Sequence, residues 1–225
     1  FRHDEQRDAL GAFRRSLDPR QDLAEEAVRR EVVAPLTNTD GHDSVRLADG
    51  STILIGYEPR GACVTGFLDA TIQKQDAAGN VVFEWNSQGL ESESLNLMAW
   101  PPGGVCQRTD YAHINSVQEI PDGSHDLLVS FRHLSAVFRI ATVPHDGHGV
   151  GDVIWKLGGK NSTFTFKDDP YPGGPCAQHA VSELPNGHVL IFDNGAGGVT
   201  PNMCLDTAPG GTAIARPFTR ITEYT

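Results

Sequence analysis

Short runs in which apolar and polar residues alternate fill the chain from about residue 40 to its last residue, and turn-forming residues such as Gly, Asn and Asp separate them. Alternation with a period of two is typical of strands that bury one face, and the separating residues favour tight turns. One pair of runs occurs three times, with turn glycines at Gly50, Gly123 and Gly187. The repetition predicts three copies of one β-hairpin.

Further apolar runs follow the first two hairpins in matching order. The third-strand runs are 67–73 and 137–141, and the fourth-strand runs are 79–85 and 151–156. Residues 220–224 correspond to a third strand of the last copy. Four strands that recur at a fixed period are typical of the blade of a β-propeller. We therefore predict an all-β fold in which residues 40–225 form about two and a half blades of a partial propeller, which ends in mid-blade as part of a longer protein.

Residues 1–39 have a different pattern. Between residues 4 and 30, apolar residues recur at helical spacing among many charges, and Pro19 separates two such sets. We expect two short amphipathic helices in an N-terminal appendage or insertion that lies against the main domain. A solvated, partly helical linker is the alternative.

The composition agrees with a turn-rich β protein. The 225 residues include 24 Gly and 14 Pro, and 39% of them are hydrophobic. The net charge of −11 disfavours nucleic acid and anionic membranes as partners. The sequence contains no apolar run of about 18 residues, so we expect no membrane insertion.

The four cysteines, Cys63, Cys106, Cys176 and Cys204, lie in loop-like segments rich in Gly and Pro, and none belongs to a CxxC pair. This spacing argues against a zinc knuckle or a thioredoxin-type site and is compatible with two disulfides in any of three pairings. Asn161 begins an Asn-Ser-Thr glycosylation sequon. These features predict a secreted or cell-surface protein. Four free thiols in an intracellular protein are the alternative.

A histidine stands at the start of each predicted hairpin: His42, His113 and His179. Equivalent strand ends of propeller blades face the same mouth of the central channel, so we expect the three imidazoles to converge. Arg132 and His133 end the hairpin that His113 begins, which places them beside it. Three imidazoles and a guanidinium would form a cationic pocket suited to a small tetrahedral oxyanion such as sulfate or phosphate.

Such a pocket allows group transfer. A neutral histidine is a nucleophile near pH 7 and can carry a sulfuryl or phosphoryl group, while neighbouring cations neutralise charge in the transition state. Three histidines are also a common zinc or copper set, but the positive charge of Arg132 disfavours a metal there. In another interpretation each histidine only hydrogen-bonds its own hairpin.

Four segments in the same part of the chain resemble one known family. They are 110–117 (DYAHINSV), 130–140 (SFRHLSAVFRI), 151–160 (GDVIWKLGGK) and 178–195 (QHAVSELPNGHVLIFDNG). Together they resemble the arylsulfotransferase family, the PAPS-independent arylsulfate sulfotransferases and their eukaryotic, fungal-type relatives. The resemblance covers about residues 40–225, and residues 1–39 match nothing in it.

The resemblance implies a six-bladed β-propeller with a funnel-shaped central site. It also implies that a sulfuryl group passes from an aryl sulfate to a phenolic acceptor through a sulfohistidine, without a cofactor or a metal. Matched position by position, His179 corresponds to the nucleophile, and His113 and Arg132 bind and polarise the sulfate. His42 would be a further sulfate-binding histidine. His133 would complete the substrate-binding set and orient Arg132.

Two other functions remain open at this level. The first is a non-catalytic extracellular propeller that serves as a structural or interaction module for partner chains in a cell-surface assembly, with buried histidines as structural donors. The second is a metal-dependent hydrolase or lactonase, for which Asp193 and Asn194 are the obvious additional ligands.

Overall fold

The computed structural model describes residues 34–36, 38–195 and 203–225 of the chain. The chain divides into two compact units, Phe1–Ala34 and Pro35–Thr225. The helices predicted between residues 4 and 30 lie outside the described residues.

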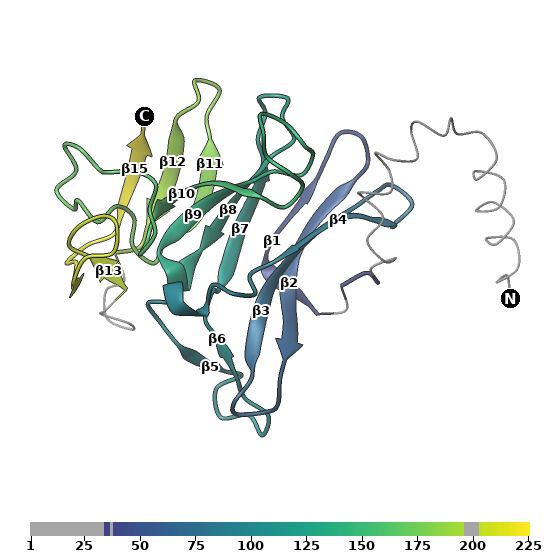
Figure 1. Ribbon diagram of the computed structural model, residues 1–225, viewed down its shortest axis with the longest axis horizontal. Helices are drawn as coiled ribbons and strands as arrows, with labels where there is room; N and C mark the ends of the chain where they lie inside the picture. The colour runs from purple at the N-terminus through teal and green to yellow at the C-terminus, as the bar shows by residue number, and fades with distance from the viewer. Residues whose placement is uncertain (1–33, 37, 196–202) are drawn as a thin grey trace, which may run out of the picture. The chain divides into compact units, whose positions relative to one another are not determined.

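The described residues form an all-β fold with almost no helix, as the alternation of the sequence predicts. Three larger sheets follow one another along the second unit as a curled array (Figure 1). The first is a mixed sheet made of β1 (Thr39–Arg46), β2 (Thr52–Arg60), β3 (Phe67–Gln75), β4 (Val81–Asn86), β5 (Met98–Trp100) and β6 (Arg108–Asp110). The second is an antiparallel sheet of β7 (Ile114–Glu119), β8 (Leu127–Phe131), β9 (Ala136–Ile140) and β10 (Val153–Gly158).

The third sheet is also antiparallel and contains β11 (His179–Glu183), β12 (Val189–Asp193) and β15 (Arg220–Tyr224). A small two-stranded sheet of β13 (Cys204–Leu205) and β14 (Ala213–Ile214) accompanies it. Two single-turn 3-10 helices, η1 (Glu91–Glu93) and η2 (Arg132–Leu134), are the helical elements of the described ranges.

The three predicted hairpins are confirmed as β1–β2, β7–β8 and β11–β12. Their turn glycines Gly50, Gly123 and Gly187 have φ angles of 87°, 87° and 79°, a conformation that other residues adopt only with strain. The predicted third and fourth strands are confirmed as well, since β3 and β4 extend the first hairpin and β9 and β10 extend the second. β15 pairs with β12 as the predicted third strand of the last copy.

The second sheet is buried on both of its faces. Ile55 of the first sheet packs in one core cluster with Phe131, and Leu128 packs in another with Ile191 of the third sheet. Successive side chains of a strand point to opposite faces, so β8 needs apolar side chains on both. Its sequence accordingly shows a nearly continuous apolar run over Leu127–Phe131, and all five residues are buried.

The first strands of the three sheets, β1, β7 and β11, lie next to one another. Side chains bridge them: the Asp43 carboxylate accepts a hydrogen bond from the Val117 N–H at 2.9 Å, and the Ser116 hydroxyl oxygen accepts one from the Val181 N–H at 3.1 Å. These bridges connect strands of different sheets. They fix the relative positions of the strand that contains His42, the strand that follows His113 and the strand that begins with His179.

Candidate active site

The three histidines converge. The ring of His42 lies 5.3 Å from that of His113 and 5.5 Å from that of His179, measured between ring centroids. In each of the three hairpins the strand register shifts beside the histidine, between Thr39 and Ser44 in β1 and at the first residues of β7 and β11. Such irregularities bend a strand and redirect a side chain. They allow the three imidazoles to meet at one end of the neighbouring strands.

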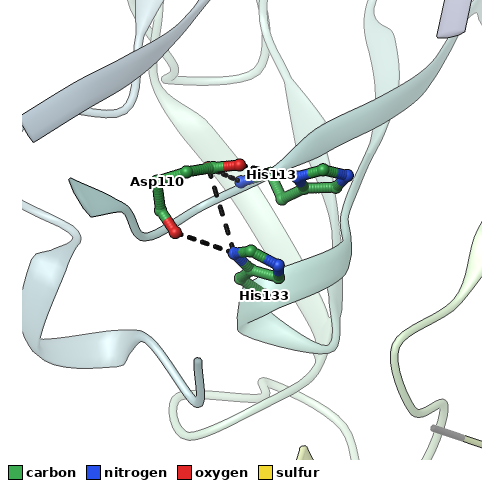
Figure 2. A group of neighbouring side chains, drawn as sticks. All are labelled: Asp110, His113 and His133. Atoms are coloured by element: carbon green, nitrogen blue, oxygen red, sulfur yellow. Dashed lines mark hydrogen bonds and ion pairs between the residues drawn. The ribbon is translucent and has the colours of Figure 1, made fainter. Parts of the chain in front are cut away.

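His113 is held by Asp110, the last residue of β6. One Asp110 oxygen accepts a hydrogen bond from the His113 N–H at 2.9 Å, and the other lies 2.6 Å from His113 Nδ1 (Figure 2). A carboxylate partner places the ring proton on Nδ1 and leaves Nε2 for other contacts. The backbone hydrogen bond also stabilises the left-handed conformation of His113, whose φ is 50°.

His42 has the same kind of partner. Its backbone N–H donates to Asp40 at 2.8 Å, and its Nδ1 contacts the same carboxylate. Neither aspartate was assigned a role from the sequence, although both stand two or three residues before their histidine. Cys176 and Ala177 occupy the corresponding positions before His179, and among the described residues no aspartate pairs with its ring.

His179 begins β11 and is half-buried. Its Nδ1 accepts a hydrogen bond from the N–H of Ala180 at 3.1 Å. Burial lowers the pKa of His179, and the electrostatic influence of His42, His113 and Arg132 lowers it further. The imidazole is therefore neutral at neutral pH, which is the state that a nucleophilic histidine requires.

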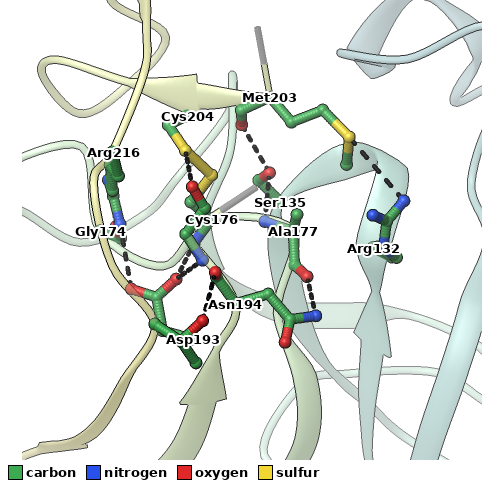
Figure 3. The surroundings of a disulfide bond; sticks show 12 residues. Arg132, Ser135, Gly174, Cys176, Ala177, Asp193, Asn194, Met203, Cys204 and Arg216 are labelled. Carbon is green, nitrogen blue, oxygen red and sulfur yellow. Dashed lines mark hydrogen bonds and ion pairs between the residues drawn. A yellow bond between two sulfur atoms is a disulfide. The ribbon is translucent and has the colours of Figure 1, made fainter. Parts of the chain in front are cut away.

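Arg132 lies on η2, directly after β8, and is partly buried. Burial lowers its pKa, but a guanidinium keeps its charge at any physiological pH. Its Nη1 lies 4.0 Å from the sulfur of Met203 (Figure 3). Within the part of the chain that the structure describes, no carboxylate forms an ion pair with Arg132. A partly buried guanidinium that has no carboxylate in an ion pair with it can take an anion as its partner.

His133 differs from the expectation that it contacts a substrate. It is completely buried and stacks against His113 with 4.6 Å between ring centroids. Its Nδ1 donates to the backbone oxygen of Asp110 at 2.8 Å, and its Nε2 accepts from the Asn96 side chain at 3.0 Å. Both nitrogens are therefore occupied by the protein. Burial lowers the pKa of His133 to about 4, so it is a neutral support beneath His113.

The group most suited to a metal ion among the described residues is Asp110, His113 and His133, whose ligand atoms lie within 4.8 Å of one another. Their donors and acceptors already satisfy each other or nearby backbone groups, and the charge of Arg132 acts on the same cluster. The hydrogen bonds explain the arrangement of these three side chains without an ion.

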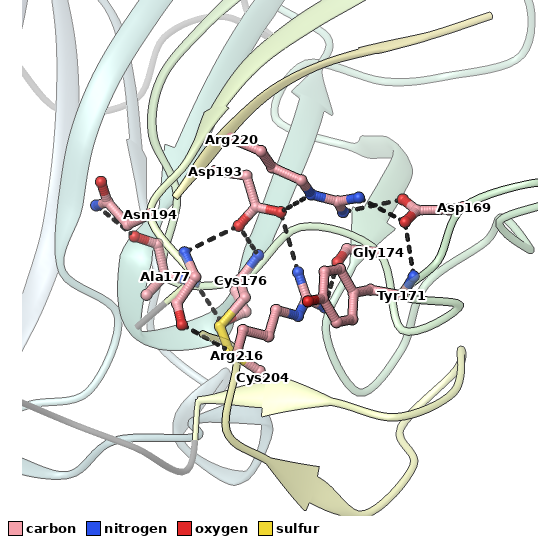
Figure 4. Close-up of polar contacts among 12 residues, drawn as sticks. Asp169, Tyr171, Gly174, Cys176, Ala177, Asp193, Asn194, Cys204, Arg216 and Arg220 are labelled. Carbon is pink, nitrogen blue, oxygen red and sulfur yellow. Dashed lines mark hydrogen bonds and ion pairs between the residues drawn. A yellow bond between two sulfur atoms is a disulfide. The ribbon is translucent and has the colours of Figure 1, made fainter. Parts of the chain in front are cut away.

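Asp193 and Asn194, the ligands considered for a metal hydrolase, have other partners. Asp193 is fully buried and forms ion pairs with Arg216 at 3.0 Å and Arg220 at 2.8 Å (Figure 4). The Asn194 amide donates to the Ala177 oxygen at 2.8 Å. This correction removes the carboxylate on which the hydrolase interpretation depended, because two guanidinium groups already neutralise it.

The structure pairs the cysteines as Cys63–Cys106 and Cys176–Cys204. The second disulfide adjoins the histidine cluster, because Met203 precedes Cys204 and its backbone oxygen accepts a hydrogen bond from the Ser135 hydroxyl at 2.6 Å (Figure 3). Two disulfides agree with an oxidising compartment.

Asn161 of the sequon is exposed in a turn that follows β10. Among the described residues, no helix has the length and hydropathy that a membrane crossing requires.

The histidine cluster lies within a recognised family domain. The family model described as Arylsulfotransferase (ASST) matches residues 39–209, a stretch that includes His42, His113, Arg132 and His179. The chain belongs to the arylsulfotransferase family. A search of the curated proteins found no match.

Proposed function

We propose that the protein transfers a sulfuryl group from an aryl sulfate to a phenolic acceptor, with His179 as the nucleophile. The observation that carries the proposal is the convergence of three imidazoles beside a guanidinium that has no carboxylate partner among the described residues. This set binds an oxyanion and supplies a neutral nitrogen next to it. Membership of the arylsulfotransferase family supports the same chemistry.

In the first half-reaction a neutral ring nitrogen of His179 attacks the sulfur of the aryl sulfate. An N–S bond forms while the bond between sulfur and the aryl oxygen breaks, and the phenol oxygen leaves with the electron pair. Arg132 neutralises the charge of the transferring group, and a neighbouring histidine gives a proton to the leaving oxygen. In the second half-reaction the acceptor phenol loses its proton to that histidine and attacks sulfur, and the N–S bond breaks.

The carboxylate partners suggest a division of roles between the histidines. His42 and His113 each have an aspartate against Nδ1, which orients the ring and leaves Nε2 for proton transfer and sulfate binding. Among the described residues no carboxylate forms a hydrogen bond or ion pair with His179, and burial together with the influence of His42, His113 and Arg132 favours its neutral form. The group that we propose to attack sulfur is thus the one of the three without a carboxylate on its ring.

The wider setting of the site is part of the same proposal. The successive sheets, whose hairpins are antiparallel and whose first strands are neighbours, support a partial β-propeller over residues 40–225, six-bladed in the family to which the chain belongs. The disulfides and the exposed Asn161 support a secreted glycoprotein of the eukaryotic, fungal-type branch. The substrates that we propose are small aromatic sulfates and phenols.

The test is a burst assay with 4-nitrophenyl sulfate and phenol. We expect phenol-dependent release of nitrophenol, and a stoichiometric burst without phenol that ends when His179 is sulfated. His179→Ala should abolish both. His188→Ala is the matched control, because His188 lies in the same hairpin at its opposite end and pairs with Glu223. A folded protein that turns over no phenol would favour the non-catalytic extracellular module.

A further inference from the structure

Gln178, the residue before His179, is completely buried between the second and third sheets. Its side-chain nitrogen faces three acceptors of the second sheet: the Ser130 hydroxyl at 3.0 Å, the Phe131 oxygen at 3.2 Å and the Ala136 oxygen at 2.9 Å. These acceptors flank η2, the turn that carries Arg132. The side chain therefore connects the backbone of His179 to the segment that positions the guanidinium.

The backbone of Gln178 is held from a second direction. Its carbonyl oxygen accepts a hydrogen bond at 2.9 Å from the side chain of Asn115, which is two residues after His113. One residue earlier, the N–H of Ala177 donates to the Ser135 hydroxyl at 2.9 Å. The residues that lead into β11 are thus hydrogen-bonded both to the start of β7, beside His113, and to the turn after β8 that carries Arg132.

The local backbone of His179 does not by itself hold the ring in place. Ala180 has a φ of 33°, and the register of β11 shifts between His179 and Val181. Within the described residues, the one hydrogen bond of the His179 ring is with the N–H of its neighbour Ala180. The position of the imidazole therefore depends on what anchors the preceding residue.

Holding the residues before β11 in this way leaves two buried side-chain oxygens unpaired, which apolar packing would avoid. The oxygens Oε1 of Gln178 and Oδ1 of Asn115 are buried without a hydrogen-bond partner in the described part of the chain. A buried amide with an unpaired oxygen is less favourable than an apolar side chain of the same shape. Two such amides, next to each other and next to His179, indicate a role in arranging the site.

We propose that Gln178, together with Asn115, is a positioning residue that aligns His179 with His113 and Arg132 across the interface between the second and third sheets. The inference rests on the proposed sulfuryl transfer for its kinetic consequence only. Its structural content, that Gln178 sets the place of the His179 ring, holds whether or not the protein is catalytic.

The kinetic test uses Gln178→Leu, which keeps the side-chain volume and removes the hydrogen bonds. A displacement of the nucleophile slows attack on sulfur while Arg132 and His113 still bind sulfate. We expect kcat for 4-nitrophenyl sulfate to fall about 10- to 100-fold, with KM unchanged within about twofold. The pH at which activity reaches half its maximum should shift as well, because the pKa of His179 depends on where its ring lies.

Gln118→Leu is the matched control. Gln118 also connects β7 to β11, since its side-chain oxygen accepts a hydrogen bond from the Glu183 N–H at 2.7 Å, but it lies at the far end of these strands. We expect it to lower the melting temperature without lowering kcat. Equal losses of kcat in the two variants would overturn the proposal, because they would show a general weakening of the interface.

The second readout does not need activity. The ring resonances of His179, assigned by comparison with His179→Ala, report its pKa by NMR titration of the full chain. We expect Gln178→Leu to raise the His179 pKa toward the ordinary value, because the ring moves away from the surrounding cations and toward solvent, and Gln118→Leu to leave it unchanged. An unchanged pKa in Gln178→Leu would overturn the proposal.

The two readouts separate the two claims. A shift of the His179 pKa in a protein that transfers no sulfuryl group would support the positioning role and reject the proposed function. Should Gln178→Leu fail to fold, Ser130→Ala removes one acceptor only, and we expect a smaller change of the same direction in kcat and in the His179 pKa. No change in either quantity would overturn the proposal.

Discussion

Asp110 binds His113 twice, through the backbone N–H at 2.9 Å and through Nδ1 at 2.6 Å, so that one carboxylate sets both the backbone and the ring of the histidine. The same aspartate offers its backbone oxygen to His133, which lies under the His113 ring. Asp110 therefore arranges both His113 and His133, the side of the cluster that we propose binds sulfate.

Asp110→Asn should reduce activity while the protein stays folded. The amide keeps the shape but not the charge, so His113 loses the carboxylate that fixes its proton on Nδ1 and orients its ring. We expect kcat to fall about 100-fold, the scale of a lost general acid–base group, and the pH profile to change. Asp126→Asn is the control, because Asp126 pairs with His145 at 2.8 Å and lies at the end of β8 opposite to Arg132. Unchanged kinetics in Asp110→Asn would contradict this role.

Arg132→Lys should weaken the binding of the sulfate group. A lysine retains the charge but offers no planar fork of donors to two sulfate oxygens. We expect KM for the aryl sulfate to rise about tenfold, in line with about 1.4 kcal/mol of lost interaction. Arg139→Lys provides the comparison, since Arg139 is in the same sheet but is paired with Asp126. A similar KM in Arg132→Lys and the unmodified protein would remove Arg132 from sulfate binding.

The rate of sulfation should fall on the acid side of its pH profile as His179 takes up a proton. Because its pKa is lowered by burial and by nearby positive charges, the neutral form persists below the ordinary histidine value of 6.5. We expect the acid limb in single-turnover experiments to lie below that pH. A limb at or above 6.5 would show that a different group controls the nucleophile.

The stability of the fold should decrease as the pH falls below 6.5, in part because of His133. The pKa of His133 is about 4 in the folded protein and 6.5 for an ordinary histidine, so the unfolded chain binds the proton first over this window. The lost free energy of unfolding is about 3 kcal/mol by pH 4, at about 1.4 kcal/mol per pKa unit. His133→Gln does not titrate, and its denaturation midpoints should vary less between pH 7 and pH 4. Equal pH dependence in both proteins would contradict the assignment.

The two disulfides should differ in their effect on activity. Replacing either pair by serines costs stability, about 2–4 kcal/mol for a typical disulfide. The bond between Cys176 and Cys204 also holds Met203 near Arg132, so its loss should reduce activity at temperatures where the protein is still folded. Loss of Cys63–Cys106 is the matched comparison, and equal losses of activity would contradict a specific link to Arg132.

Much of the strand content follows from local pattern. Alternation of apolar and polar residues and the turn glycines predict the hairpins, because both depend on neighbours in sequence. β5 and β6 were not predicted, since each spans three residues between Gly-rich and Pro-rich segments. Their pairing is set by contacts with each other and with β3, which no local pattern reveals.

The sequence predicted the residues of the site but not the hydrogen bonds that hold them. A repeated position identified His42, His113 and His179, and the hairpin geometry placed Arg132 beside them. The aspartate partners had a signal close in sequence, a carboxylate shortly before the histidine. The Asn96 partner of His133 had none, because it comes from a loop 37 residues away. The burial of His133 could not be predicted for that reason, because it depends on tertiary packing.

Each of the three larger sheets contributes one of the histidines that converge. A chain in which only one or two sheets have folded would carry separate imidazoles but not the assembled set beside Arg132. If the protein transfers a sulfuryl group as we propose, its activity would therefore require all three sheets to be packed together.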